Sequence, residues 1–313
     1  MKSYNHLYNQ ICSFENLLLA SRKAQRGKRF KEYTGKFNFN LENELITLQQ
    51  ELIDKTYQPG AYTEFYIYDA KKRKISAAPY RDRVVHHALC NLIEPIFDKS
   101  MIYDTYANRQ GKGTHSAILR FQSFSRKNSY AFKGDIKKYF PCIDHKILLE
   151  TLFDRIQCKD TRWLIKIIID NSNPQEEVLD YFNGDDLLTP IMRRKGLPLG
   201  NLTSQFFANI YLNGFDHFIK EGLQCKYYIR YVDDFVLFSN NKRELKSLKN
   251  ELIDYLETIR LKINSKRSQI IPTEKGVSLK ATGLCVAVHG TTIPTIAEQL
   301  IVIGTTQRIR TTT

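Results

Sequence analysis

The sequence predicts an α+β fold in which an antiparallel sheet is backed by helices. Residues 226–230, 235–238 and 130–135 are short runs rich in β-branched and aromatic residues, which is typical of strands. Residues 41–52 and 83–97 instead space their apolar side chains at the helical period. With 313 residues, 42% of them hydrophobic, the chain can bury a core that is divided over more than one subdomain.

Further elements complete this pattern in chain order. The sequence predicts a strand over 62–68, one continuous helix over 152–170, a polar loop over 171–186 and a helix in the apolar stretch 206–212. Two histidines, His86 and His87, fall inside the helix predicted over 83–97, where packing or a surface position is expected rather than metal binding.

Two adjacent acids, Asp233 and Asp234, fall at the turn between the runs 226–230 and 235–238. Asp is common in turns, so an ordinary hairpin turn is one interpretation. Two carboxylates a few ångströms apart repel each other, however, and a shared divalent cation is an economical reason for holding them together.

A third acid, Asp135, ends the strand predicted over 130–135; a turn closed by Pro141 and a helix beginning near Asp144 are expected to follow. Hard oxygen ligands of this kind suit Mg²⁺, which keeps several waters and is completed by substrate phosphates. Two such ions, about 3.5 to 4 Å apart, can activate an attacking hydroxyl and stabilise the leaving oxygen of an in-line phosphoryl displacement. The three acids therefore indicate polymerase chemistry.

A glycine-rich loop lies between these acids, with Gly196, Pro198 and Gly200 placed so that backbone can approach a ligand closely. Thr203 or Ser204 is expected to cap the helix that follows, and a helix N-terminus favours phosphate. A plain loop that caps a core helix is the alternative.

In this order the motifs resemble those of reverse transcriptases, over residues 40–275. Asp135 is similar to the first metal-binding Asp of that family's palm, residues 200–205 to its palm loop, and Tyr-Val-Asp-Asp at 231–234 to its Tyr-X-Asp-Asp box. Two upstream segments resemble the fingers of bacterial, intron-like members of the family: residues 74–89 and 106–117.

The resemblance implies a right-hand polymerase fold with fingers, a palm sheet backed by helices, and a thumb that is short or truncated. The expected divisions are an N-terminal helical extension (1–60), fingers (61–125), a palm with the catalytic site (126–275) and an atypical or truncated thumb or tail (276–313). A thumb of this family is a basic helical bundle, whereas residues 281–313 hold only three charged side chains.

The resemblance also implies roles for individual residues. Asp135, Asp233 and Asp234 are expected to hold two Mg²⁺ ions, for which Mn²⁺ can substitute, with the carbonyl of Ile136 as a further ligand. Phe140 falls where the family places an aromatic steric gate that would clash with a 2′-hydroxyl and so favour deoxynucleotides. A core Phe is the alternative there.

Several side chains are expected to contact the nucleotide. Lys74 and Arg81 are candidates for gripping its triphosphate, with Arg73 or Arg83 as alternatives. Lys266 resembles a lysine that helps pyrophosphate leave, a solvated lysine being the alternative. The complete nucleotide-binding set is Lys74, Arg81, Phe140, Leu199, Gly200, Ser204, Gln205 and Lys266.

The palm loop departs from the usual family pattern. Most reverse transcriptases have Gln-Gly, three variable residues and Ser-Pro, whereas this chain has Leu199-Gly200 and ends Ser204-Gln205. That form is similar to the reverse transcriptases of diversity-generating retroelements, which copy a template-repeat RNA into mutagenised cDNA. Leu199 lacks the hydrogen-bonding group of Gln, and the resemblance implies looser selection at template adenines. The alternatives are a retron, group II intron-like or phage-defence reverse transcriptase, or a nucleic-acid-binding relic without catalysis.

The charge of the chain fits a polyanionic partner. Its formal net charge is +14 and its pI is near 9.4. The expected partners are an RNA template, a DNA or RNA primer and dNTPs, and the resemblance adds a small basic accessory protein. The basic residues within 21–31 either contact template RNA or form a solvated helix end.

The remaining composition predicts a cytoplasmic protein without a membrane partner. Six scattered cysteines show no zinc-binding spacing and are expected to be reduced thiols. No apolar run approaches the roughly 20 residues of a membrane span.

Overall fold

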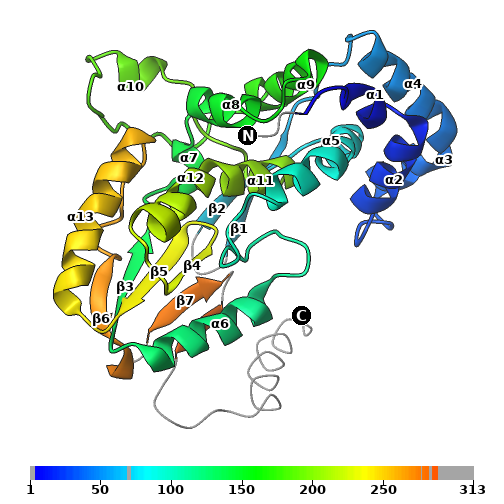
Figure 1. The fold of residues 1–313 in the computed structure, drawn as a ribbon. Coiled ribbons are helices and arrows are strands. Elements are labelled where there is room, and N and C mark those ends of the chain that lie inside the picture. Colours follow the sequence, from blue (N-terminus) through cyan, green and yellow to red (C-terminus); the bar gives the residue numbers. More distant parts are fainter. Residues whose placement is uncertain (1–3, 69–71, 276, 282–283, 288–313) are drawn as a thin grey trace.

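A four-stranded antiparallel sheet, here called the central sheet, has helices packed against it (Figure 1). The computed structural model describes residues 4–68, 72–275, 277–281 and 284–287. The sheet has the strand order β4 (Tyr228–Tyr231), β5 (Asp234–Ser239), β3 (Tyr130–Asp135) and β6 (Gln269–Pro272). The first three of these are the strands that the sequence predicts, and the α+β class is confirmed.

Helices and two small hairpins surround this sheet. The helices are α1 (Tyr8–Ile11), α2 (Phe14–Ala24), α3 (Glu32–Phe39), α4 (Leu41–Ile53), α5 (Tyr80–Asp98), α6 (Thr114–Lys127), α7 (Tyr139–Cys142), α8 (His145–Phe153), α9 (Lys159–Asp170), α10 (Thr189–Met192), α11 (Leu202–Tyr211), α12 (Asn213–His217) and α13 (Lys242–Thr258). A π-helical turn, η1 (Phe218–Gly222), follows α12, and a 3₁₀ turn, η2 (Thr273–Lys275), follows β6. The hairpins are β1 (Thr63–Tyr68) with β2 (Lys72–Ala77), and β7 (Ser278–Ala281) with β8 (Leu284–Ala287).

Both faces of the central sheet are buried. Successive residues of a strand point to opposite faces, so each strand contributes side chains to both. Phe235 and Leu237 of β5 join the main hydrophobic core, on the side that α12 and α13 cover. Val236 and Phe238 point the other way and pack in a second cluster that includes Phe121 of α6. Alternate side chains of β5 therefore pack in two different hydrophobic clusters, one on each face of the sheet.

The β1–β2 hairpin is tied to the loop that precedes α11. The N–H of Ser76 donates to the carbonyl of Leu199 at 2.9 Å. The side-chain amide of Asn201 donates to the carbonyl of Ser76 at 2.8 Å and accepts from the N–H of Ala78 at 3.1 Å. Residues of the predicted fingers and of the predicted palm loop are thus hydrogen-bonded to each other.

The helix predicted over 152–170 is in fact two helices. α8 ends at Phe153 and α9 begins at Lys159. The interruption has a tertiary cause, since the N–H of Tyr4 donates to the carbonyl of Arg155 at 2.9 Å in a short parallel bridge. The prediction of one helix was wrong because hydrophobic spacing does not reveal pairing with a distant part of the chain.

The start of α8 is set by Asp144, as predicted. Its carboxylate accepts from the N–H groups of Lys146 and Ile147 at 2.8 and 3.2 Å, which is the normal N-cap arrangement. Pro141, expected to close a turn, lies in the one-turn helix α7.

The tail predicted at 276–313 begins with the β7–β8 hairpin, which is separate from the central sheet. Residues 288–313, the rest of the predicted thumb or tail, lie outside the described residues. Within the described ranges, no helix combines the length and the apolar composition that crossing a membrane requires.

Candidate active site

Asp135 and Asp234 lie directly opposite each other on neighbouring strands. They end β3 and begin β5, and the antiparallel register pairs them. Residues paired in this way project from the same face of the sheet, with Cβ atoms about 5 Å apart. The N–H of Ile136 also donates to the carbonyl of Asp233 at 3.4 Å. The backbone therefore places the three predicted acids at the same end of the two strands.

The turn that carries Asp233 is tight, as predicted. Tyr231 pairs with Asp234, so only Val232 and Asp233 connect β4 to β5. Val232 has φ +58°, in the left-handed region that β-branched residues rarely adopt. Such a conformation persists only where the surroundings hold it.

Arg230 is the residue that holds this turn. Its Nη1 donates to the carbonyl of Val232 at 2.9 Å and to the side-chain oxygen of Asn209 at 3.2 Å. Its Nη2 and Nε donate to the carboxylate of Asp216 at 2.6 and 2.7 Å. The hydroxyls of Tyr228 and Thr105 donate to the same carboxylate, at 2.6 and 2.9 Å. A buried, fully hydrogen-bonded ion pair thus connects α12 to the backbone of the turn.

Sequence reasoning missed Arg230 and Asp216. A signal was present, because Arg230 is a charged residue in an otherwise apolar strand immediately before the Tyr-Val-Asp-Asp box. A charge in such a strand is seldom buried without a partner. The partner, Asp216, lies in a different element and could not be identified from spacing.

Asp135 has further neighbours in the segment after α13. The amide of Asn264 donates to its Oδ2 at 2.8 Å, and the hydroxyl of Ser268 accepts from its backbone N–H at 3.0 Å. The guanidinium of Arg267 lies 3.9 Å from the same Oδ2. Lys266, the lysine predicted near the site, is exposed. The cation that faces Asp135 is Arg267, the residue that follows Lys266.

The palm-loop residues divide between buried and accessible positions. Gly200 has φ +109°, and a Cβ there would lie 2.8 Å from Cγ2 of Ile75, so the loop requires glycine at this point. Ser204 is buried in α11, whereas Gln205 is exposed. Leu199 is half-buried, and its carbonyl is bonded to β2.

The prediction that Thr203 or Ser204 caps α11 was wrong. The N-cap residue is Asn201, and its side chain makes no cap hydrogen bond because it is bonded to β2 instead. Thr203 and Ser204 are both buried within the helix. The side chain of Asn201 therefore bonds to the β1–β2 hairpin instead of capping α11.

Phe140 is half-buried beside the same loop. Its ring centroid lies 5.7 Å from that of Tyr139, and its carbonyl accepts from the N–H of Leu197 at 2.9 Å. The structure thus brings Phe140 next to the loop that also carries Leu199 and Gly200.

The two cations predicted to grip a triphosphate already have partners inside the protein. Lys74 pairs with Glu64 across the hairpin at 2.9 Å and also donates to the carbonyl of Pro174 at 3.2 Å. Arg81 pairs with Glu51 of α4, and its guanidinium lies 5.6 Å from the ring centroid of Tyr57. Neither pair is fully buried, so exchange of the carboxylate for a phosphate needs no rearrangement of the core.

The donor chemistry at the turn suits Mg²⁺, although among the described residues no three His, Cys, Asp or Glu side chains are gathered as in a formed metal site. Asp135 and Asp234 present carboxylate oxygens from one face of the sheet, and Asp233 lies on the turn immediately before Asp234. Hard anionic oxygens at the end of a sheet are the ligands that Mg²⁺ takes from proteins. Arg267 stands where it offers Asp135 positive charge.

Comparison with known proteins gives a consistent result. A family model described as reverse transcriptase (RNA-dependent DNA polymerase) matches residues 67–283. Protein YkfC of Escherichia coli (strain K12) is 24% identical over an alignment of 267 residues that covers 72% of this chain and 67% of that protein. Group II intron-encoded protein LtrA of Lactococcus lactis subsp. cremoris is 23% identical over 183 residues, which are 57% of this chain and 28% of that protein.

A solved structure shares the fold. Apo telomerase from Candida Tropicalis, truncated from its C-terminal domain, superposes with a TM-score of 0.50 at 17% identity, covering 77% of this chain and 58% of that chain. The chain thus spans 67% of YkfC but only 28% of LtrA.

Proposed function

Because the chain belongs to the reverse transcriptase (RNA-dependent DNA polymerase) family, we propose that it is an RNA-directed DNA polymerase that makes cDNA from an RNA template. The observation that carries the proposal is the pairing of Asp135 with Asp234, beside Asp233 on a two-residue turn. The substrates are the RNA template, a DNA or RNA primer and dNTPs.

The carboxylates provide the metal-binding part of this reaction. Asp135, Asp233 and Asp234, with the carbonyl of Ile136, would hold two Mg²⁺ ions. When bound, those ions would supply positive charge to the primer hydroxyl and to the leaving pyrophosphate. Mn²⁺ has the same preference for oxygen ligands and would substitute.

Protein groups around the acids provide their positions. Asn264 and Ser268 orient the side chain and backbone of Asp135. Arg230 holds the carbonyl of Val232 and thereby the conformation of the turn that carries Asp233. Positioning of this kind matters because misplacement of a reacting group by about 1 Å can cost about a hundredfold in rate.

The nucleotide would lie beside the palm loop. Phe140 is the proposed steric gate, and its contact with the loop at Leu197 supports that role. Lys74 and Arg81 would exchange Glu64 and Glu51 for the triphosphate. Leu199, Gly200, Ser204, Gln205 and Lys266 complete the proposed set.

The retroelement class that we propose is the diversity-generating one, with a small basic accessory protein as a partner. Leu199 and the Ser204-Gln205 ending of the palm loop support it, because Leu cannot make the hydrogen bonds of Gln beside the nascent base pair. The second candidate is a group II intron-like reverse transcriptase, which the similarity to LtrA favours.

Primer extension tests the proposed activity. The purified chain is given Mg²⁺, dNTPs and a primed RNA template, and we expect dNTP incorporation that Asp233→Ala/Asp234→Ala abolishes. Asp254→Ala, which removes an exposed carboxylate from α13, is the matched control and should keep full activity. Extension that persists in the double variant would exclude this site as the catalytic one.

Sequencing of the products separates the two retroelement classes. Errors concentrated opposite template adenine, and reduced by Leu199→Gln, support the diversity-generating class. Errors spread evenly over the four template bases, and unchanged in that variant, favour the intron-like class.

A further inference from the structure

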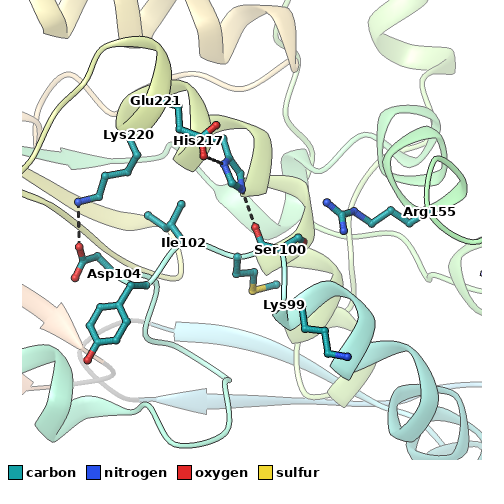
Figure 2. A pocket seen from close by; sticks show the side chains of 10 residues that line it. Lys99, Ser100, Ile102, Asp104, Arg155, His217, Lys220 and Glu221 are labelled. Atoms are coloured by element: carbon teal, nitrogen blue, oxygen red, sulfur yellow. Dashed lines mark hydrogen bonds and ion pairs between the residues drawn. The ribbon is translucent and has the colours of Figure 1, made fainter. Parts of the chain in front are cut away.

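A pocket whose lining includes several charged side chains contains none of the three aspartates. It has a volume of about 610 Å³ and is formed by the segment after α5, the connection between α8 and α9, and the end of α12 with η1 (Figure 2). None of its lining residues belongs to the candidate active site. Its volume lies within the roughly 300 to 1,000 Å³ of typical small-ligand sites, which is large enough for a nucleotide.

The two acids of this pocket already have partners inside the protein. Asp104 accepts from Lys220 at 3.0 Å and from Arg120 at 2.8 Å. Glu221 lies 2.7 Å from Nδ1 of His217 (Figure 2). The carboxylates are therefore compensated locally, and the lining does not present them as sites for a cation.

His217 adds to the positive character of the lining. Its Nε2 lies 2.7 Å from the carbonyl of Ser100. Burial lowers the pKa of His217, but the bonds to Ser100 and Glu221 outweigh burial and bring the pKa above its ordinary value.

Two cations of the lining have no such compensation. The guanidinium of Arg155 lies 5.9 Å from the ring centroid of Phe97, and among the described residues neither Arg155 nor Lys99 forms an ion pair with a carboxylate. The backbone of Arg155 is fixed by its bond to Tyr4, and its guanidinium extends toward Ser100 and His217 (Figure 2). A half-buried, positioned guanidinium with no protein anion is suited to binding a phosphate.

An exposed aromatic ring completes the pocket. Tyr103 is 69% exposed although it is one of the lining residues. The ammonium of Lys112 lies 3.3 Å from the centroid of its ring and the guanidinium of Arg120 lies 5.5 Å from it. Exposed aromatic rings among cations are the elements on which single-stranded nucleic acids stack their bases.

The backbone at the rim is also unusual. Residues 218–222 form a π-helical turn, η1, which carries Lys220 and Glu221. Single π-helical turns are rare and are frequently found at functional sites.

We propose that this pocket binds single-stranded nucleic acid, with a phosphodiester at Arg155 and an unpaired base stacked on Tyr103. The site lies outside the proposed catalytic centre, so it would hold a strand that is not at that moment being copied. Its chemistry is shared by RNA and DNA. The formal charge of +14 on the chain favours such a polyanion over an uncharged ligand.

Fluorescence anisotropy of labelled single-stranded RNA and DNA of one sequence tests the proposal on the full chain. We expect Arg155→Gln/Lys99→Gln to weaken binding and to lower the slope of log K against log salt by about 1.4, as expected for two lost contacts to a single strand. Lys242→Gln/Lys246→Gln is the charge-matched control, since both residues are exposed on α13 and line no part of the pocket.

Two variants of the aromatic residue test the stacking. Tyr103→Ala should weaken binding about fivefold or more, as loss of one stacked base does, and Tyr103→Phe should restore it. The strand that binds more tightly identifies whether RNA or DNA is the source of the ligand. Circular dichroism confirms that each variant is folded.

Three results would overturn the proposal. The first is an equal loss of strand affinity in Arg155→Gln/Lys99→Gln and in the α13 control. The second is an unchanged strand affinity in Tyr103→Ala. The third is tighter binding of a labelled poly-glutamate peptide than of either strand. None of these outcomes is measured by primer extension. A failure of this binding proposal would therefore not affect the proposed polymerase activity, and a failure of that activity would not affect this proposal.

Discussion

Arg230 and Asp216 form an ion pair from which solvent is completely excluded. Nη2 of Arg230 lies 2.6 Å from Oδ2 of Asp216, and neither side chain has exposed surface. The same guanidinium donates to the carbonyl of Val232. A buried charge thus supports the backbone of the turn that carries two of the three aspartates.

Removal of Arg230 should destabilise the protein strongly. Arg230→Met leaves the carboxylate of Asp216 buried without a counter-charge, and we expect the free energy of unfolding to fall by about 3 to 5 kcal/mol. Urea-induced unfolding followed by circular dichroism measures this change. Arg243→Met, at an exposed position of α13, is the control and should stay within about 0.5 kcal/mol of the parent. A similar loss in both variants would contradict the role given to the ion pair.

A methyl group at Gly134 should be poorly tolerated. A Cβ there would lie 2.2 Å from Cζ of Phe235, the residue opposite on β5. We expect Gly134→Ala to lower the free energy of unfolding by about 1 to 3 kcal/mol, because the ring can move only by displacing its neighbours.

Gly35 is the matched control for that substitution. It lies in α3 with nothing within 4 Å of its ideal Cβ, so Gly35→Ala should raise helix stability by about 0.5 to 1 kcal/mol. Both variants are compared in urea titrations. Finding that Gly134→Ala stabilises the protein would show that Phe235 has room to move.

Arg267 should influence the Mg²⁺ requirement of the proposed activity. Its guanidinium lies 3.9 Å from Oδ2 of Asp135 and would compete with a bound metal ion for that carboxylate. The side chain of Arg267 is 39% exposed, so solvent weakens the effect. We expect Arg267→Gln to lower the Mg²⁺ concentration that gives half-maximal primer extension by about two- to fivefold.

A lysine of α13 provides the comparison. Lys246→Gln removes the same charge from an exposed position and should leave the Mg²⁺ dependence unchanged. A higher Mg²⁺ requirement in Arg267→Gln would indicate that Arg267 helps to assemble the site instead.

Acid should destabilise the protein through α5. Burial lowers the pKa of His86 to about 3 and that of His87 to about 4. An unfolded histidine has a pKa of about 6.5, so below that pH the unfolded chain binds protons that the folded chain does not. Their contribution to stability is therefore complete above about pH 6.5 and is lost as the pH falls toward 4.

The midpoint of urea unfolding measured from pH 7.5 to pH 5 checks this expectation. Carboxylates also titrate toward the lower end of this range, so the comparison is between variants. His86→Leu should reduce the loss of stability on acidification, whereas His115→Leu, at an exposed position of α6, should leave it as in the parent. Identical pH profiles for His86→Leu and the parent would rule out His86 as a source of the acid sensitivity.

The sequence allowed the prediction of the elements whose signals are local. The hairpin around Asp233 and Asp234 and the strand ending at Asp135 follow from short runs of residues with strong strand preference. The start of α8 at Asp144 follows from capping. Each of these depends on a few consecutive residues.

Features that depend on distant contacts were not predictable. The hydrogen bonds of Asp135 to Asn264 and Ser268 join residues that are 129 and 133 positions apart. The break between α8 and α9 depends on Tyr4, and the position of Asn201 depends on β2. In each case a contact with a distant part of the chain overrides a local preference. Such a contact leaves no periodic pattern in the sequence from which it could be predicted.

The strand order of the central sheet has a consequence for synthesis of the protein on the ribosome. β3 lies between β5 and β6, and both partners are made after it, with helices α7 to α12 intervening before β5. The N-terminal helices, by contrast, contact α5, which is made early. Because contacts between distant segments must wait for the later segment to emerge, the N-terminal part can fold during translation while β3 still lacks both neighbours. Asp135 therefore has its partner Asp234 and its hydrogen-bond partners Asn264 and Ser268 in place only when translation has passed β6.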